Sequence, residues 1–265
     1  MTKQCKISIR NGRKEISHLA VRIAEPEGGS ELPVALLYLH GFGSGQEGNK
    51  AGFFRQKALQ SGLTFCSFDF QGHGDSGGEM NGLTLSRNLE DVRRVHAVLR
   101  SRGHRRVVIL GSSMGALTGL WYSALHPTEL VAGLHISPAL GLEEGLAGWA
   151  GEEGLRRWED DGSLEVENEN GSWDLDWSFM LDLCSYNDHK LLDLYRTPCL
   201  ILQGQQDDRV DWTRVQDFAA ECPYRDIEFH LFADGDHRLV DRKDRLWELM
   251  VGYLRGKGYL NGEAY

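Results

Sequence analysis

At residues 107–115 the chain reads VVILGSSMG, an apolar run that ends in a glycine–serine turn. The unbroken hydrophobicity of its first four residues is typical of a strand that is covered on both faces. The letters that follow fit the pattern G-x-S-x-G, with Gly111 and Gly115 on either side of Ser113. Where a strand turns sharply into a helix, small neighbours leave room for a base and a substrate to approach the serine. The stretch therefore makes Ser113 the candidate nucleophile, although so short a pattern also arises by chance in a chain with 32 glycines.

Apolar runs of strand length recur along the chain, with helical patterns between them. The predicted strands are 34–40, 64–70, 106–112, 131–137, 198–204 and 227–233. The predicted helices are 51–60, 83–102, 114–126, 212–222 and 241–255. Residues before Pro33 resemble an antiparallel lead-in. This alternation predicts an α/β fold, a mostly parallel, doubly wound sheet whose strand-to-helix loops share one edge.

One region breaks the alternation, because residues 141–192 are acidic and rich in tryptophan. We interpret residues 1–265 as a single domain and this region, called the insertion below, as a small cap within it. Residues 164–175 alternate on both sides of Asn170-Gly171, which predicts a β-hairpin with an Asn-Gly turn. Large aromatic faces in a cap suit an apolar substrate pocket, although they equally suit packing of the cap onto the sheet. The candidate substrate-binding residues are Trp149, Trp158, Trp173 and Trp177.

The composition restricts the partners. A formal net charge of -10 argues against nucleic acids and anionic membrane surfaces, which are bound through clustered Lys and Arg. The five cysteines are widely spaced and include no C-x-x-C pair, so we expect reduced thiols and no metal site. The start of the chain has no secretory pattern, and no apolar run is long enough to span a bilayer. We expect a cytoplasmic protein that acts on small molecules.

A glycine-rich turn, His40-Gly41-Phe42-Gly43-Ser44, follows the first long strand. Its backbone is able to come close to a substrate oxygen, since glycines carry no side chain there. We assign the N–H groups of Phe42 and Met114 as the donors of an oxyanion hole, which binds the negative oxygen of an acyl-transfer intermediate. The competing interpretation is a plain loop whose glycines serve only the turn.

An acid that orients the base is expected after a later strand, and residues 200–210 read LILQGQQDDRV. Asp207 lies three residues past the glycine that ends this strand, and we choose it as the acid. Asp208 and Asp211 are close rivals, and a solvated loop charge is the ordinary explanation for any of the three.

The base is expected after the last strand, where Ala233-Asp234-Gly235-Asp236-His237 delivers a histidine just before the final helix. His237 is the candidate general base. A second histidine, His73, lies in a glycine-rich loop after another strand. Because glycines flank it as they would a turn residue, we expect His73 to be architectural.

Taken in order, the motifs resemble the α/β-hydrolase superfamily of serine esterases. They are residues 40–43, 72–76, 111–115, 204–210 and 236–237, and the order Ser, Asp, His is the one that this family uses. Residues 48–51, 111–115, 206–212 and 236–238 are also similar to mitochondrial depalmitoylating esterases that cleave acyl glucuronides. The chain departs from that subgroup by its start, which is unlike a transit peptide, and by its more acidic insertion.

The resemblance implies a hydrolase of carboxylic esters or thioesters that works through an acyl-enzyme on Ser113, with His237 and Asp207 completing the triad. This chemistry needs neither a metal nor an organic cofactor. Two other functions remain open. An acyltransferase or perhydrolase would use the same triad, and a ligand receptor would keep the fold without rapid turnover.

Overall fold

The computed structural model describes residues 2–11, 14–30, 32, 34–168 and 171–260. Its main sheet has eight strands in the order β1-β2-β4-β3-β5-β6-β9-β10. The strands are β1 (Thr2–Asn11), β2 (Lys14–Ala24), β3 (Val34–Leu39), β4 (Thr64–Phe68), β5 (Arg106–Ser112), β6 (Ala132–Ile136), β9 (Cys199–Gly204) and β10 (Ile227–Phe232). From β4 to β10 all neighbours are parallel, whereas β1 and β2 form the expected antiparallel lead-in. The predicted fold class, an α/β fold with a mostly parallel, doubly wound sheet, is confirmed.

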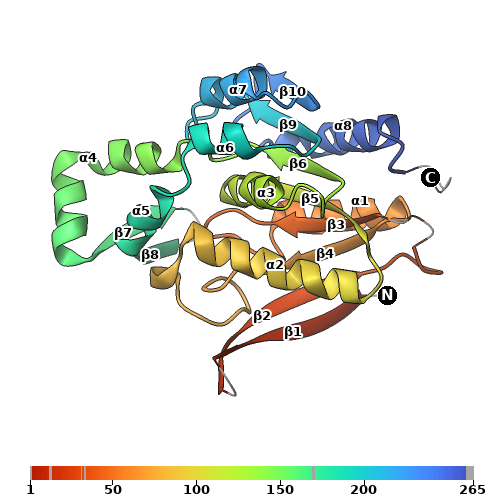
Figure 1. The fold of residues 1–265 in the computed structure, drawn as a ribbon, viewed down its shortest axis with the longest axis horizontal. Coiled ribbons are helices and arrows are strands. Elements are labelled where there is room, and N and C mark those ends of the chain that lie inside the picture. The colour runs from red at the N-terminus through yellow and green to blue at the C-terminus, as the bar shows by residue number, and fades with distance from the viewer. Residues whose placement is uncertain (1, 12–13, 31, 33, 169–170, 261–265) are drawn as a thin grey trace.

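Helices cover both faces of this sheet (Figure 1). On one face, α1 (Asn49–Gln60) and α8 (Lys243–Gly256) pack on the side chains of β3, β5 and β9, around Phe54 and Trp247. On the other face, α2 (Leu85–Ser101), α3 (Met114–Leu125) and α7 (Trp212–Glu221) enclose a second core around Trp121. Strands between two apolar layers need apolar residues at every position, and β3 is buried along its whole length. Short 3₁₀ turns, η1 (Met80–Gly82) and η2 (Val240–Arg242), precede α2 and α8.

The register of the sheet places the functional loops side by side. Leu39 at the end of β3 pairs with Gly111, so the glycine-rich turn of residues 40–44 leaves the sheet beside the turn that carries Ser113. Gly204 at the end of β9 pairs with Phe232 at the end of β10, so the loops that follow these strands are also neighbours. All four loops lie at the carboxyl ends of parallel strands, the edge where ligands bind in open α/β sheets.

The insertion lies between β6 and β9 and forms an arm at the left of Figure 1. It contains α4 (Leu142–Asp161), the antiparallel hairpin β7 (Ser163–Asn168) and β8 (Gly171–Asp176), and α5 (Ser178–Leu183), and α6 (Asp188–Leu194) begins within it. Asn168 pairs with Gly171, so the connection is made by residues 169–170, which lie outside the described residues. The predicted β-hairpin is present and Gly171 is the first residue of β8, whereas Asn170 of the predicted Asn-Gly turn lies outside the described residues.

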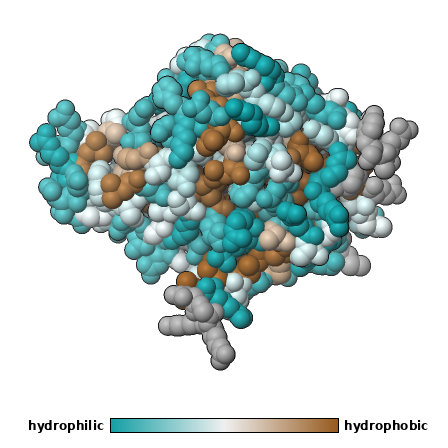
Figure 2. Space-filling view, viewed as in Figure 1, coloured by the Kyte–Doolittle hydropathy of each residue, from teal (hydrophilic) through white to brown (hydrophobic). Residues whose placement is uncertain are grey.

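Gly151 has a φ of 68°, which interrupts α4 with a kink in the middle of the arm. Hydrophilic and hydrophobic side chains alternate over this arm, while hydrophilic residues cover most of the face viewed in Figure 2. Among the described residues, no helix is both long enough and apolar enough to cross a bilayer.

Candidate active site

Ser113 occupies the turn between β5 and α3 in a backbone conformation that L-residues rarely adopt. Its φ is 56° and its ψ is -123°. Two close approaches explain the flanking glycines. A Cβ on Gly115 would lie 2.3 Å from the carbonyl oxygen of Leu39, and a Cβ on Gly111 would lie 2.6 Å from Cα of Ala116. The strained turn is thus held from both sides, as expected where a serine is lifted out of a sheet.

His237 reaches this serine from the loop after β10. Its Nε2 lies 3.0 Å from Oγ of Ser113, and its Nδ1 lies 2.8 Å and 3.0 Å from the two carboxylate oxygens of Asp207. With Nδ1–H donating to the carboxylate, Nε2 is left to accept the serine proton. The structure therefore joins the three residues singled out in the sequence in one chain of hydrogen bonds.

The carboxylate of Asp207 is held from several directions. Its side chain has no exposed surface, and it accepts hydrogen bonds from Gln203 Nε2 and from the backbone N–H groups of Arg209 and Val210. Burial raises the pKa of this carboxyl, but the hydrogen bond and charge of His237, with the two backbone donors, outweigh burial and hold the pKa below its usual value. Asp207 is an ionised acceptor whose orientation is fixed by the loop itself.

The two rival carboxylates lie elsewhere. The side chain of Asp208 is 79% exposed and faces Arg209. Asp211 caps α7, where its Oδ1 accepts the N–H of Thr213. Solvation and helix capping account for these two residues, and among the described residues it is Asp207 whose carboxylate bonds to Nδ1 of His237.

Gly204 lets the loops of Asp207 and His237 approach each other. A Cβ at this position would lie 2.4 Å from the carbonyl oxygens of both Gly235 and Asp236. Gln206 N–H also donates to the Gly235 carbonyl, which joins the two loops directly. The close approach depends on glycine and not on an unusual φ.

The glycine-rich turn after β3 lies directly against the serine. A Cβ on Gly41 would lie 3.2 Å from Cβ of Ser113. The N–H groups of Phe42 and Met114 donate no hydrogen bond to any described residue, so both are available to a ligand. Met114 is the first residue of α3, where the partial positive charge of a helix N-terminus adds to the effect of the donor.

Two buried histidines hold the backbone of this turn by hydrogen bonds. His40 donates through Nδ1 to the Gly41 carbonyl and accepts the N–H of Phe70 at Nε2. His73 accepts the N–H of Gly43 at Nε2, 3.3 Å away. Burial lowers the pKa of His40 to about 4 and that of His73 to about 3, so both rings are neutral near pH 7. The sequence marked His73 as architectural but did not show that it holds the turn beside Ser113.

The four candidate tryptophans have different surroundings. Trp173 on β8 packs edge-on against the ring of Phe42, with centroids 5.3 Å apart. Trp158 is fully buried inside the insertion, where its indole N–H donates to the Leu175 carbonyl and its ring meets Trp177. Trp149 is 60% exposed. Trp173 is thus the tryptophan that the structure places against a residue of the glycine-rich turn.

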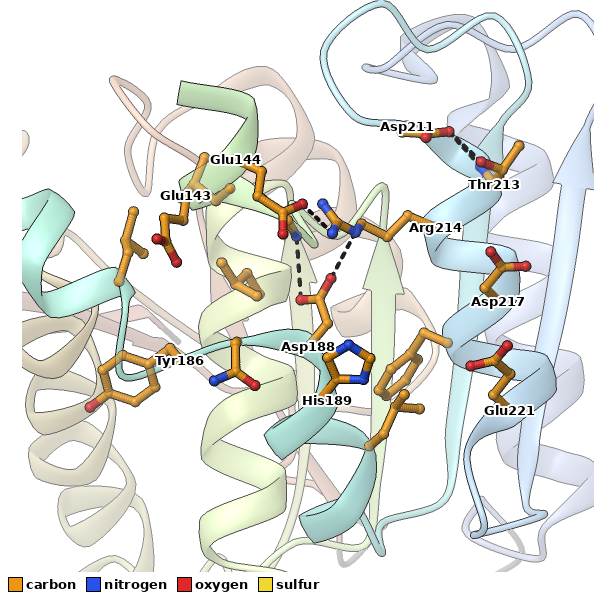
Figure 3. Close-up of a pocket in the computed structure, with 17 residues that line it drawn as sticks. Glu143, Glu144, Tyr186, Asp188, His189, Asp211, Thr213, Arg214, Asp217 and Glu221 are labelled. Atoms are coloured by element: carbon orange, nitrogen blue, oxygen red, sulfur yellow. Dashed lines mark hydrogen bonds and ion pairs between the residues drawn. The ribbon is translucent and has the colours of Figure 1, made fainter. Parts of the chain in front are cut away.

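A separate cavity of about 480 Å³ lies between the insertion and α7 (Figure 3). Its lining is rich in carboxylates and does not include Ser113, Asp207 or His237. Arg214 of α7 forms ion pairs here with Glu144, at the start of the insertion, and with Asp188, near its end. Asp188 also accepts the N–H of Gly141. Arg214 therefore ties both ends of the insertion to α7.

A doubly wound parallel sheet with a strand–turn–helix serine at its carboxyl edge is the architecture of the α/β-hydrolase fold class. The chain belongs to the alpha/beta hydrolase family, whose sequence model matches residues 36–249. This membership supports hydrolase chemistry at the level of the family. The fold and the resemblance predicted from the sequence are both confirmed.

Among known proteins, the chain is similar to the mouse palmitoyl-protein thioesterase ABHD10, mitochondrial. The two are 23% identical over 221 residues, which cover 79% of this chain and 70% of the mouse protein. The solved structure of mouse alpha/beta hydrolase domain-containing protein 10 has a TM-score of 0.79 and 22% identity, covering 96% of this chain and 99% of that one. Est1E from Butyrivibrio proteoclasticus, solved with ferulic acid bound, has a TM-score of 0.77 and 20% identity, covering 90% and 96%.

Proposed function

We propose that the protein is a serine hydrolase that cleaves carboxylic ester or thioester bonds of small, apolar acyl substrates. The observation that carries this proposal is the unbroken chain of hydrogen bonds from Ser113 Oγ through His237 to Asp207. A serine hydroxyl is a weak nucleophile by itself, and an adjacent imidazole held by a carboxylate is the arrangement that activates it. Membership of the alpha/beta hydrolase family agrees with this chemistry.

In the first step, His237 takes the proton of Ser113 as Oγ attacks the acyl carbonyl. The carbonyl carbon becomes tetrahedral, and the N–H groups of Phe42 and Met114 donate to its negative oxygen. Asp207 stabilises the imidazolium that forms and keeps its Nε2 directed at the reacting atoms. His237 then gives its proton to the leaving alcohol or thiol, and the acyl group remains bound to Ser113.

In the second step, His237 takes a proton from a water molecule, which attacks the acyl-enzyme. The second tetrahedral species collapses, Ser113 recovers its proton from His237, and the carboxylic acid leaves. Protein groups accept and return every proton in this sequence, and it needs neither a metal nor an organic cofactor.

We propose further that the insertion acts as a cap and that Trp173 forms one wall of the acyl site. Its ring packs on Phe42, whose backbone N–H is one of the proposed oxyanion donors, so an acyl group bound there would extend along both rings. The acidic surface of the insertion would repel strongly anionic leaving groups. A strong preference for coenzyme A thioesters would contradict that part of the proposal.

Ser113→Ala provides the test. With p-nitrophenyl esters of increasing acyl length, we expect kcat to fall by about four orders of magnitude or more and labelling by a fluorophosphonate to disappear. Ser123→Ala is the matched control, because Ser123 lies on α3 and its hydroxyl bonds only to the Gly119 carbonyl of the same helix. Turnover by Ser113→Ala at the wild-type rate would overturn the proposed nucleophile.

The same panel separates the competing functions. Rapid, repeated turnover with water supports the hydrolase. A rate that rises steeply with added alcohol or peroxide, together with the transferred product, supports an acyltransferase or perhydrolase. A single slow turnover with retained product supports a ligand receptor. Location in the cytoplasm stays a prediction, and the mouse relative is named as mitochondrial.

A further inference from the structure

Lys50 reaches the nucleophile turn from the opposite side of the sheet. It lies in the first turn of α1, and its Nζ donates to the hydroxyl of Ser112 at 2.6 Å. Ser112 is buried and directly precedes Ser113, so this bond joins α1 to the residue next to the proposed nucleophile. A hydrogen bond from an ionised donor is stronger than one between neutral groups, so protonation of Lys50 strengthens its bond to Ser112.

The position of Lys50 is unfavourable for a lysine on two counts. The N-terminus of a helix carries a partial positive charge, yet α1 has no acidic side chain in its first turn and no side-chain cap from Gly48. Burial also penalises the ammonium and lowers the pKa of Lys50 to about 8. Residues that break local rules in this way are concentrated at functional sites.

Charged groups of two site loops act on the ammonium electrostatically. The charges of Asp236, in the loop that carries His237, and of Asp207 favour the protonated amine, whereas Arg238 opposes it. On the side of α8, Lys243 binds the side chain of Asn49, the neighbour of Lys50. Asp236 also shapes the loop of His237, because its Oδ1 accepts the N–H of Leu239 at 2.7 Å. The ammonium is bonded to the nucleophile turn and attracted to the loop of the base.

We propose that Lys50 is a positioning residue, whose ammonium fixes the nucleophile turn through Ser112 and attracts the loop that carries His237. The inference rests on the proposed function, since it assigns a role in the action of Ser113. Loss of the positive charge weakens the hydrogen bond to Ser112 and the attraction to Asp236. Ser113 and His237 are then held less firmly in the geometry needed for proton transfer. The residue acts through Ser112 and Asp236, and it does not itself contact the acyl group.

The proposal predicts an ionisation that belongs to Lys50 in the rate profile. For the wild type we expect kcat for p-nitrophenyl acetate to fall about tenfold on the alkaline side, with a midpoint near pH 8, to a lower plateau. Lys50→Met keeps the apolar stem and removes the charge. We expect its kcat at pH 7 to match the alkaline plateau of the wild type, with KM unchanged and the midpoint near pH 8 absent. If Lys50 had only a structural role, Lys50→Met would lower kcat but would keep the midpoint near pH 8 in its pH profile.

Three further variants complete the experiment. Lys50→Arg stays charged at all these pH values, so its alkaline fall is expected to vanish while much of the rate at pH 7 remains. Ser112→Ala removes the acceptor and is expected to lower kcat by a similar factor. Lys57→Met is the matched control, because Lys57 lies on the same helix and pairs with Asp244, and its profile is expected to equal the wild type.

The outcomes are separable from those of the proposed function. If Ser113→Ala keeps its activity, the proposed nucleophile is wrong and the role of Lys50 fails with it. If Ser113→Ala is inactive but Lys50→Met has the wild-type rate, or retains the midpoint near pH 8, only the inference about Lys50 is overturned. If Lys50→Met does not fold, two other results would still overturn the inference. One is a wild-type kcat that does not fall on the alkaline side, and the other is an alkaline fall that persists in Lys50→Arg.

Discussion

The Nε2 of His237 and the Oγ of Ser113 lie 3.0 Å apart, although 124 residues separate them along the chain. The contact follows from the order of the parallel strands. The serine directly follows β5, and β6, β9 and β10 come next in the sheet, so the loops after β9 and β10 extend back over the turn after β5. An imidazole is short, so the loop of His237 must be placed accurately for Nε2 to reach Ser113. The close packing of Gly204 against that loop helps to fix its position.

The first prediction concerns the strain at Ser113. Its φ of 56° costs a residue with a Cβ about 1–3 kcal/mol, and glycine avoids that cost. We therefore expect Ser113→Gly to be about 1 kcal/mol more stable than Ser113→Ala in urea unfolding, with both variants inactive. The opposite order is expected at Ser123, in the middle of α3, where glycine is about 1 kcal/mol worse than alanine. Equal stabilities at Ser113 would show that the turn is unstrained.

The second prediction distinguishes the acid from its neighbour. Asp207→Asn keeps the shape of the side chain but removes the charge that orients the imidazole, so kcat is expected to fall by about three to four orders of magnitude. Asp208→Asn changes an exposed side chain and is expected to leave kcat within about twofold. Steady-state kinetics on one ester decides the assignment. A large loss in Asp208→Asn with none in Asp207→Asn would reverse the roles.

The third prediction concerns stability in acid. His135 of β6 is completely buried with neither ring nitrogen hydrogen-bonded, and burial lowers its pKa to about 3. The unfolded chain binds a proton near pH 6.5, whereas the folded chain does not until near pH 3. The contribution of the neutral ring is therefore complete above pH 6.5 and is lost as the pH falls from 6.5 towards 3.

Between pH 7 and pH 5 this single residue should lower the free energy of unfolding by about 2 kcal/mol. In urea titrations at both pH values, His135→Met is expected to lose less stability on acidification than the wild type by about that amount. His189→Gln, at an exposed position, is the control and should follow the wild type. An unchanged difference in His135→Met would show that the ring is protonated in the fold.

The fourth prediction addresses the acyl site. Trp173→Ala removes the ring that packs on Phe42, so KM is expected to rise about tenfold for aryl or long-chain esters and much less for acetate. Trp149→Ala, at a tryptophan of the same insertion that is 60% exposed, should leave both constants unchanged. A series of acyl lengths with both variants is the measurement. Equal effects on acetate and on long esters would place the acyl group elsewhere.

Most of the architecture was predictable because its signals are local. The central strands β3, β4, β5, β6 and β9 are buried along almost their whole length and read as apolar runs. These five strands and β10 begin and end within two residues of their expected limits. The three residues of the hydrogen-bonded chain were also found, since each follows the end of a parallel strand. The choice between Asp207 and Asp208 needed the coordinates, because one residue along the loop changes a buried acceptor into a solvated charge.

The features that the sequence did not reveal depend on contacts between residues that are far apart along the chain. The residues around Lys50 contributed to the family resemblance but gave no sign that its amine bonds to the hydroxyl of Ser112. Nothing in the composition of the insertion separates Trp173 from Trp158, although one packs on the glycine-rich turn and the other fills the interior of the arm. Both the bond of Lys50 and the surroundings of the tryptophans follow from how segments far apart in the sequence pack together. The local hydrophobic periodicity of a sequence carries no information about such packing.

The ion pairs of Arg214 have a consequence for how this protein is able to diversify. They bind the first and last parts of the insertion to the same side chain. The strands on either side of the insertion, β6 and β9, are also paired neighbours in the sheet. Lengthening a loop whose stems are already fixed adds little to its closure entropy. A longer or shorter arm between these fixed stems is therefore expected to cost the fold little stability and to leave the positions of Ser113 and His237 unchanged.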